Sequence, residues 1–497
     1  MATLRFTGGP TYFCKRHTIR SLMTSRAFVA SVVVLASMIG VPATAQRPQV
    51  SRSNAPFVSV DAPVVALTHV RVFDGTGTPP RDDQTVIVRD ERIAAVGPAR
   101  STTIPAGAQV IDLTGHVVIP GLVGLHEHTW FGGMRVSTPM GTSAPLLYLA
   151  MGVTTGMTAG SQFPYHELNL KRAVDAGAIP GPRFEIAGPY LTAAPPNSRS
   201  ANRLLSSPEE ARRVIDYWGD EGATWFKFLG GGTREVVGAA IAEAHRRGLK
   251  VTGHLCSVTF TEAAALGMDL LQHGFITNSE YVPNKQPDVC PPDNMRAQAD
   301  VDVGSPAVQA SIRAIVSHGT AVVSTLGVYE TFMPTRARLD SAAMEMVDPV
   351  ARKEIEANHA NLAQSGFTVP DRLLRKMMQW ERDFVRAGGL LGAGCDPWGT
   401  GYIPGFGDLR NYEMLIEAGF RPEEAVQIMT FNGARILGKD HETGSIAPGK
   451  LADLVVIRGD PVRSPKDIYN VITVFKGGVG YDSMKLRGAA KGLVGVN

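Results

Sequence analysis

The chain has few of the residues that would place it in several common protein classes. Only four of its 497 residues are cysteine and none stands in a CxxC pair, so a disulfide-built scaffold is not expected. Charged residues make up 19% and hydrophobic residues 44%, which is typical of a globular enzyme and excludes a disordered chain. The length allows a large core and two domains.

Long apolar runs are also scarce, because only residues 27–41 form one. This run follows a segment with five basic residues and no acid, and it precedes the small residues of PATA (42–45). That order predicts a secretory signal over residues 1–45, cleaved after Ala45, with either Met1 or Met23 as its start. A membrane helix is the alternative, but the run is shorter than the roughly 20 residues needed to span a bilayer. The chain is therefore predicted to be exported, to the periplasm or the medium, without stable membrane insertion.

No excess of positive charge remains once the leader is removed. The whole chain carries +3, and losing five basic residues leaves −2 for the mature chain. Nothing here favours nucleic acid or an anionic membrane as a partner. Three cysteines stay in the mature chain and cannot all pair; Cys256 and Cys395, beside two candidate ligands, are interpreted as small buried hydrophobic residues.

The pattern of apolar residues divides the mature chain into three parts. Residues 46–115 contain short alternating segments and turn pairs such as Asp74-Gly75, which predict antiparallel strands. Similar segments return in residues 441–497. Between them, residues 116–440 alternate strand-like and helix-like segments. We expect one small β-sandwich built from both ends of the chain around a central α/β domain.

Eight strand-like segments in the central part favour a TIM-type (β/α)8 barrel. The polar ends of three successive strands fall at 227, 254 and 273, and these spacings suit compact βα units. A doubly wound open sheet is the alternative, but no GxGxxG follows the first strand. The stretches 275–318 and 329–387 are too long for ordinary loops, so they are expected to hold extra helices over the barrel mouth.

Two histidines follow the apolar run VVIPGLVG directly. Residues two apart on a strand point to the same side, so His126 and His128 would share one face and could bind one metal ion. Taken alone, the pair could equally be a polar loop after a strand.

Other strand ends carry residues of the same kind. Lys227 stands between Phe226 and Phe228, so alternation would send the two rings toward the helices and the lysine into the barrel. Burial would lower the pKa of Lys227 and make a neutral amine available, which can take up carbon dioxide to form an anionic carbamate. The alternative is a lysine that reaches solvent or forms a salt bridge.

His254, His273 and Asp396 end three further strands. Each could serve a structural role alone: a hydrogen-bonded histidine, or an aspartate that caps a turn before proline. Together with the first three they place six candidate ligands at the ends of barrel strands, where catalytic residues of this fold lie.

These motifs, with VRVFDGTG near the start and MTFNGARILG and GSIAPGKLADLVV near the end, resemble the amidohydrolase superfamily over nearly all of the mature chain. The likeness is to its imidazolonepropionase-like and prolidase-like branch. The resemblance implies two divalent metal ions, with zinc expected. His126, His128 and Asp396 would hold one ion and His254 and His273 the other, with N6-carboxylated Lys227 bridging them. Family members often self-associate, which leaves a homo-oligomer open. Glu127, between the first two histidines, departs from the usual pattern and puts the pocket beside that metal in doubt.

The implied function is hydrolysis of an amide or peptide bond in a small molecule, such as a dipeptide or an N-acyl amino acid. Two cations would lower the pKa of a shared water, and Asp396 would act as general acid and base. Tyr165, His166, Tyr329 and Trp398 are candidates for lining the mouth. An esterase, lactonase or phosphotriesterase with the same centre stays open, as does a non-catalytic metal-binding or carbohydrate-binding protein. A deaminase with a single metal ion is disfavoured, because it would not need the bridging Lys227.

Overall fold

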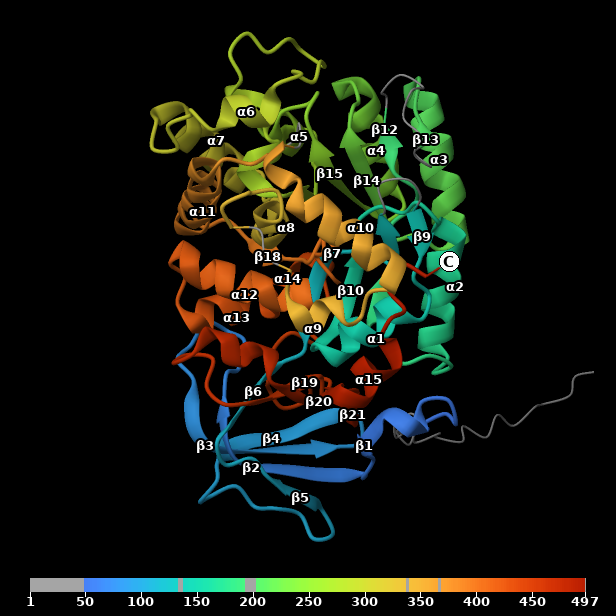
Figure 1. The fold of residues 1–497 in the computed structure, drawn as a ribbon, viewed down its shortest axis with the longest axis vertical. Helices are drawn as coiled ribbons and strands as arrows, with labels where there is room; N and C mark the ends of the chain where they lie inside the picture. The colour runs from blue at the N-terminus through green and yellow to red at the C-terminus, as the bar shows by residue number, and fades with distance from the viewer. Residues whose placement is uncertain (1–48, 133–136, 193–202, 337–338, 365–367, 497) are drawn as a thin grey trace, which may run out of the picture. The chain divides into compact units, whose positions relative to one another are not determined.

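The computed structural model describes residues 49–132, 137–192, 203–336, 339–364 and 368–496. The predicted leader, residues 1–45, lies outside this part of the chain. The described residues form an α/β structure with two large sheets and a two-stranded ribbon (Figure 1). None of the helices in these ranges is long and apolar enough to cross a bilayer.

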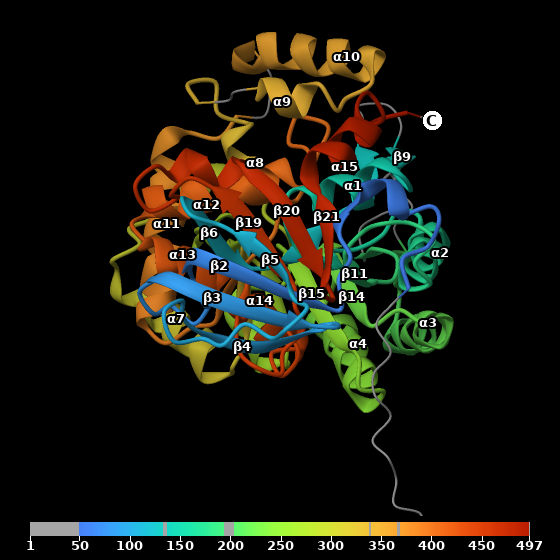
Figure 2. The same ribbon diagram turned by 90° about the horizontal axis from the view of Figure 1, so that it is seen from below.

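Strands from both ends of the chain form one nine-stranded sheet. Its order is β1-β21-β20-β19-β6-β2-β3-β4, and β5 pairs with β2. The strands are β1 (Val58–Val60), β2 (Val64–Val72), β3 (Arg81–Arg89), β4 (Arg92–Pro98), β5 (Gln109–Asp112), β6 (His116–Pro120), β19 (Leu454–Arg458), β20 (Val471–Lys476) and β21 (Val479–Asp482). The antiparallel pair β6 and β19 joins the two ends, and Figure 2 shows the blue strands beside the red ones. The ends of the chain therefore meet in a shared sheet.

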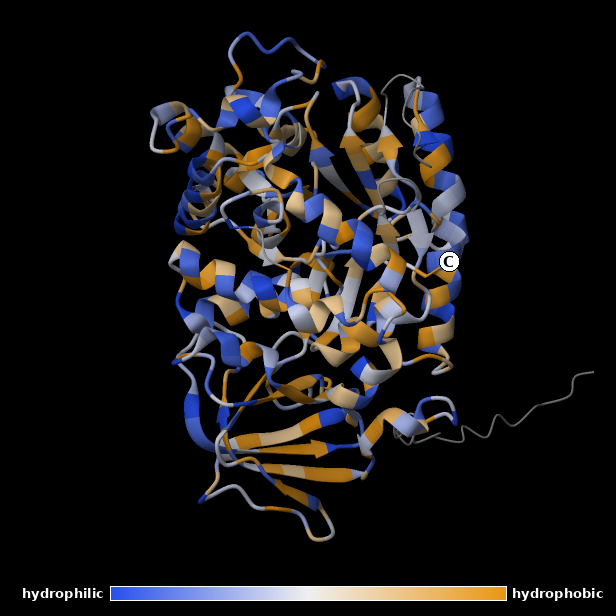
Figure 3. Ribbon diagram, viewed as in Figure 1, coloured by the Kyte–Doolittle hydropathy of each residue, from blue (hydrophilic) through white to orange (hydrophobic). Residues whose placement is uncertain are grey.

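Alternating apolar residues give this sheet a core of its own. Val65, Leu67 and Val86 from the N-terminal strands pack with Leu454 and Val456 from the C-terminal part. The strands appear largely apolar in Figure 3, whereas helices such as α11 and α3 carry mixed colours. This is the pattern expected of half-buried strands and amphipathic helices.

A second sheet has ten parallel strands and carries the candidate site. Its order is β11-β10-β7-β18-β17-β16-β15-β14-β12-β13. The strands are β7 (Leu122–Glu127), β10 (Val153–Thr158), β11 (Arg183–Glu185), β12 (Leu191–Thr192), β13 (Arg203–Leu204), β14 (Trp225–Gly230), β15 (Lys250–Leu255), β16 (Leu270–Gln272), β17 (Ala321–Ser324) and β18 (Leu391–Ala393). The predicted class, α/β with a parallel sheet, is confirmed. An isolated parallel bridge also links Ala187, just beyond β11, to Trp225 of β14.

Helices follow most of these strands. They are α1 (Ser143–Ala150), α2 (Pro164–Asp175), α3 (Pro208–Glu221), α4 (Arg234–Arg246), α5 (Phe260–Ala265), α6 (Asn294–Gln298), α7 (Pro306–Ser317), α8 (Leu326–Glu330), α9 (Ser341–Met344), α10 (Pro349–Ala360), α11 (Asp371–Arg386), α12 (Phe406–Ala418), α13 (Pro422–Met429), α14 (Phe431–Leu437) and α15 (Ser483–Ala490). Helix α4 shows why they form: the Thr233 side chain caps its start, its apolar positions are buried, and Gly248 just beyond it has a φ of +70°.

Extra helices occupy the two long stretches, as expected. The first holds α6 and α7, and the second holds α9, α10 and α11 together with the end of α8. The short ribbon of β8 (Trp130–Gly132) and β9 (Ser137–Pro139) follows the first strand of the parallel sheet.

The interpretation of Cys256 as an unpaired hydrophobic residue is wrong. Cys256 and Cys290 form a disulfide, with their Cα atoms 4.9 Å apart. The two lie 34 positions apart, and the long stretch after β16 returns over the end of β15 to bring them together. Cys395 is free and buried, as expected.

Thiol titration tests this pairing. The mature protein, denatured without reductant, should show one reactive thiol, and three after reduction. Closing a loop of 34 residues stabilises by about 4 kcal/mol in the chain-entropy account, so the C256S/C290S variant should lose about that free energy of unfolding. Wild-type protein unfolded under reducing conditions is the control and should match the variant. Three reactive thiols before reduction would show that the disulfide does not form.

Candidate metal centre

The two histidines at the end of β7 face an aspartate at the end of the neighbouring strand. The Nε2 atoms of His126 and His128 lie 3.3 and 3.2 Å from Oδ1 of Asp396. Strand β18 pairs with β7, and the Asp396 backbone N–H donates to the His126 carbonyl at 2.7 Å. A Cβ at Gly394 would clash with the His126 backbone, so glycine there permits this close approach. Pairing of the two strands thus delivers all three side chains to one point.

The side chain of Lys227, on β14, reaches His126 from another part of the same sheet. Its Nζ lies 2.9 Å from Nε2 of His126, and the side chain is only 2% exposed. Phe226 and Phe228 pack in the cluster that includes the helices, whereas Trp225 packs with strand residues, as the alternation predicts. Burial lowers the pKa of Lys227 to about 7, with Asp396 opposing part of the shift. A substantial neutral fraction of the amine is therefore present at physiological pH.

His254 and His273 complete the group. Their ring centroids are 4.6 Å apart, and His273 is also 4.6 Å from His126. Nδ1 of His273 lies 2.8 Å from the Thr325 hydroxyl and 3.7 Å from Oδ2 of Asp396. We call these side chains the six-residue cluster: His126, His128, Lys227, His254, His273 and Asp396.

Burial sets the charge state of the cluster. It lowers the pKa of His126 to about 3 and that of His254 to about 4, and it also lowers the pKa values of His128 and His273. These imidazoles are therefore neutral at pH 7. Burial alone would raise the pKa of Asp396, but the facing histidines hold it well below its usual value. The centre offers neutral nitrogens around one carboxylate.

This donor set fits a divalent transition metal. The donor atoms of His126, His128 and Asp396 lie within 4.8 Å of one another. Neutral imidazole nitrogen and carboxylate oxygen are ligands that zinc accepts. Nδ1 of His126 and of His128 has no hydrogen-bond partner among the described residues, although both atoms are buried.

Two residues of the cluster have left-handed backbone conformations. Asp396 has a φ of +51° and His273 a φ of +67°. Such values are uncommon for residues other than glycine, and they gather at functional sites. Here they turn the chain at a strand end and aim the side chain inward.

Glu127 points away from the metal-facing side of β7. Its buried carboxyl lies with Cys395 and Asp408, and Oε1 accepts from the Cys395 backbone N–H at 3.3 Å. Burial and the Asp408 carboxyl raise the pKa of Glu127 well above its usual value, and burial raises that of Asp408 to about 7. Glu127 thus supports the segment that carries Asp396. Sequence reasoning missed Asp408 and Thr325, because neither lies at a recognisable motif.

A cavity of about 320 Å³ opens onto the cluster. Its other walls are mainly aromatic and aliphatic: Trp130, Gln162, Tyr190, Leu229, Met295, Val328, Tyr329, Phe332 and Trp398. We call it the aromatic cavity. The expectation that Tyr329 and Trp398 line the mouth agrees with the structure. Tyr165 and His166 are not in this lining; Tyr165 is 45% exposed and hydrogen-bonds Tyr217 on α3, because α2 carries it to the outer surface.

Curated relatives match parts of the chain. An imidazolonepropionase of Arthrobacter sp. (strain FB24) is 37% identical over 97 residues, which cover 19% of this chain and 24% of that protein. Adenine deaminase 3 of Rhizobium meliloti (strain 1021) is 23% identical over 406 residues, which cover 78% of this chain and 53% of that protein. The chain spans less than two thirds of the length of these relatives.

Solved structures match over more of their length. A putative prolidase from Bifidobacterium longum is 25% identical with a TM-score of 0.64, covering 86% of this chain and 95% of that one. The ochratoxinase of A. niger is 17% identical with a TM-score of 0.61, and the match covers 85% of this chain and 96% of the ochratoxinase chain. The two proteins share a fold. The sequence profile described as "Amidohydrolase family" matches residues 117–480, the parallel sheet and most of the C-terminal strands. The chain belongs to the amidohydrolase family.

Proposed function

We propose that this chain is an exported metal-dependent hydrolase that cleaves the amide or peptide C–N bond of a small molecule, such as a dipeptide or an N-acyl amino acid. The observation that carries the proposal is the six-residue cluster, in which four neutral imidazoles surround one carboxylate and a low-pKa lysine. The likeness to the B. longum protein, described as a putative prolidase, supports a C–N bond as the target.

The residues are assigned in two sets. His126, His128 and Asp396 would hold one divalent ion, and His254 and His273 the second; zinc is the metal proposed. The neutral amine of Lys227 would add to carbon dioxide, forming an N–C bond and releasing one proton, to give a carbamate that bridges the two sets. When bound, the ions would supply Lewis acidity and lower the pKa of a water near the scissile carbonyl.

Asp396 is assigned the proton transfers. Its depressed pKa keeps it ionised at neutral pH, so an Oδ atom can accept the proton of the attacking water. The same atom would then hand that proton to the leaving amine. The walls of the aromatic cavity would exclude bulk water from this exchange and orient an apolar group of the substrate.

The proposal also includes the domain architecture and the export of the chain. We assign residues 116–440 to a closed (β/α)8 barrel and residues 46–115 with 441–497 to a β-sandwich. The Ala187 to Trp225 bridge supports closure, because it links the β11 side of the parallel sheet to β14. The Cys256–Cys290 disulfide supports export, since such bonds persist in oxidising compartments.

Asp396→Asn tests the assignment of the proton transfers. The variant should keep metal bound by the histidines but lose at least about 100-fold in kcat, the usual contribution of a general acid–base. Metal content by mass spectrometry and turnover of a dipeptide and N-acyl amino acid panel are measured together. Wild-type turnover by D396N would remove Asp396 from the mechanism. Esters, lactones and phosphotriesters in the same panel separate the other activities.

Carbamate formation at Lys227 can be followed directly. Holoprotein reconstituted with metal and ¹³C-labelled bicarbonate should show a carbamate carbon by NMR, and K227A should not. Because the amine must be neutral to attack carbon dioxide, the initial rate of uptake at fixed dissolved carbon dioxide should rise about tenfold from pH 6 to pH 8, with a midpoint about 7. Below that midpoint the amine is protonated and uptake falls. A label that survives in K227A, or a flat pH profile, would contradict the assignment.

A further inference from the structure

A second cavity of about 610 Å³ adjoins the candidate metal centre. Its lining includes Leu255 at the end of β15, residues of α6, and five residues around the start of α11: Thr368, Val369, Pro370, Arg372 and Leu373. His254 and Met295 line both this space and the aromatic cavity, so the two spaces meet at those side chains. We call the second space the side cavity. A substrate at the metal centre that reached past the His254 and Met295 side chains would enter the side cavity.

The walls of the two cavities differ in charge. Apart from the six-residue cluster, the aromatic cavity has no charged residue in its lining. The side cavity contains Arg296, Arg372 and Asp293. An apolar group suits the first space, and a charged group needs the second.

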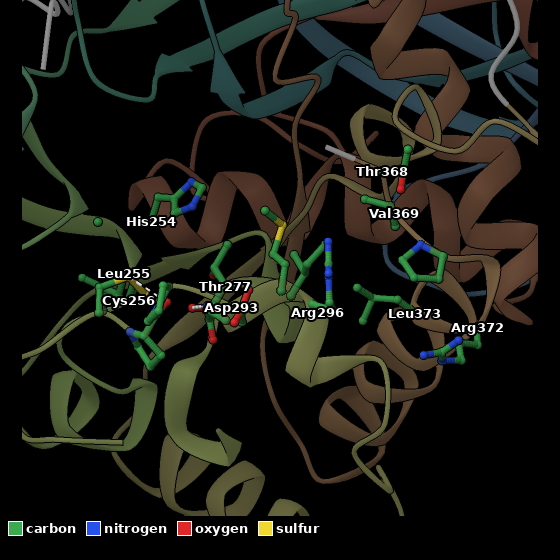
Figure 4. Close-up of a pocket in the computed structure, with 18 residues that line it drawn as sticks. His254, Leu255, Cys256, Thr277, Asp293, Arg296, Thr368, Val369, Arg372 and Leu373 are labelled. Carbon is green, nitrogen blue, oxygen red and sulfur yellow. Dashed lines mark hydrogen bonds between the residues drawn. A yellow bond between two sulfur atoms is a disulfide. The ribbon is translucent and has the colours of Figure 1, made fainter. Parts of the chain in front are cut away.

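Arg296 is the available cation of the side cavity. Figure 4 shows its side chain between His254 on one side and Thr368 and Val369 on the other. Within the part of the chain described, its guanidinium makes no ion pair and no side-chain hydrogen bond, and it forms no ion pair with Asp293, three positions earlier.

Arg372, by contrast, is engaged. Its guanidinium pairs with Asp300 at 3.1 Å and donates to the Ala299 carbonyl at 3.3 Å. Two arginines thus line one cavity. The guanidinium of Arg372 is held in place by Asp300 and the Ala299 carbonyl, whereas that of Arg296 has no such partner among the described residues. Arg372 is a matched control for it.

We propose that Arg296 binds the free carboxylate of the substrate, which makes the substrate class N-acyl amino acids with an apolar acyl group. This rests on the proposed C–N hydrolysis at the metal centre. The planar guanidinium offers paired donors that match a carboxylate, and the apolar acyl group packs among Trp130, Tyr329 and Trp398. Asp293 opposes the carboxylate, so its removal strengthens binding.

The test compares an N-acyl amino acid with its C-terminal carboxamide, using metal-loaded wild type, R296Q, R372Q and D293N. R296Q should raise KM for the acid roughly 10- to 100-fold, the range expected for a charge-assisted hydrogen bond, and leave KM for the carboxamide unchanged. R372Q should change neither, and D293N should lower KM for the acid. Equal metal content in all variants excludes loss of the centre as the cause.

A binding measurement separates this inference from the proposed function. Calorimetry on metal-loaded D396N should show that the acid binds more tightly than the carboxamide, and that R296Q in the same background abolishes the difference. If wild type cleaves both compounds equally and R296Q changes nothing, the carboxylate site is wrong while the hydrolase stands. If no amide is cleaved but binding of the acid depends on Arg296, the hydrolase is wrong and the anion site stands.

Discussion

The carboxylate of Asp396 lies within 3.7 Å of three buried imidazoles, and the rest of the site is arranged around this contact. A lone carboxylate at such depth would favour its protonated form, and a lone lysine would favour its neutral amine. Here the imidazoles hold the carboxylate in its charged form, while burial keeps the imidazoles and much of the lysine neutral. The result is a cluster of electron-pair donors with a negative centre. Lys227, which is protonated in part of the molecules at neutral pH, balances some of the negative charge of Asp396. A divalent cation bound by the cluster would balance it more fully.

The parallel sheet explains how residues from distant parts of the sequence meet. Parallel strands point the same way, so side chains in or just beyond β7, β14, β15, β16 and β18 meet at one side of the sheet without any local sequence contact. Gly394 lets two of these strands approach closely, and Glu127 supports the segment that carries Asp396. Helices from the long stretches then supply walls, with Met295 on α6 and Tyr329 on α8 closing the space above the cluster.

Much of this arrangement could be predicted from the sequence because strand geometry has a period of two. The spacing of His126 and His128 and the flanking rings of Lys227 fix which way these side chains point. Contacts that depend on how loops and helices return to the sheet could not be predicted. The Cys256–Cys290 disulfide depends on how a 34-residue segment returns, and the contact of Glu127 with Asp408 joins a strand to a helix far along the chain. Tyr165 and His166 follow β10 of the same sheet, yet both lie in the first turn of α2, and neither lines the aromatic cavity.

Anomalous X-ray diffraction at the zinc absorption edge, on crystals of the protein as purified, would locate both proposed ions. Two peaks are expected. One should lie about 2.1 Å from nitrogens of His126 and His128, and the other at the same distance from His254 and His273, with density beyond Nζ of Lys227 reaching both. A single peak, peaks away from these side chains, or an unmodified Lys227 that touches neither ion would contradict it.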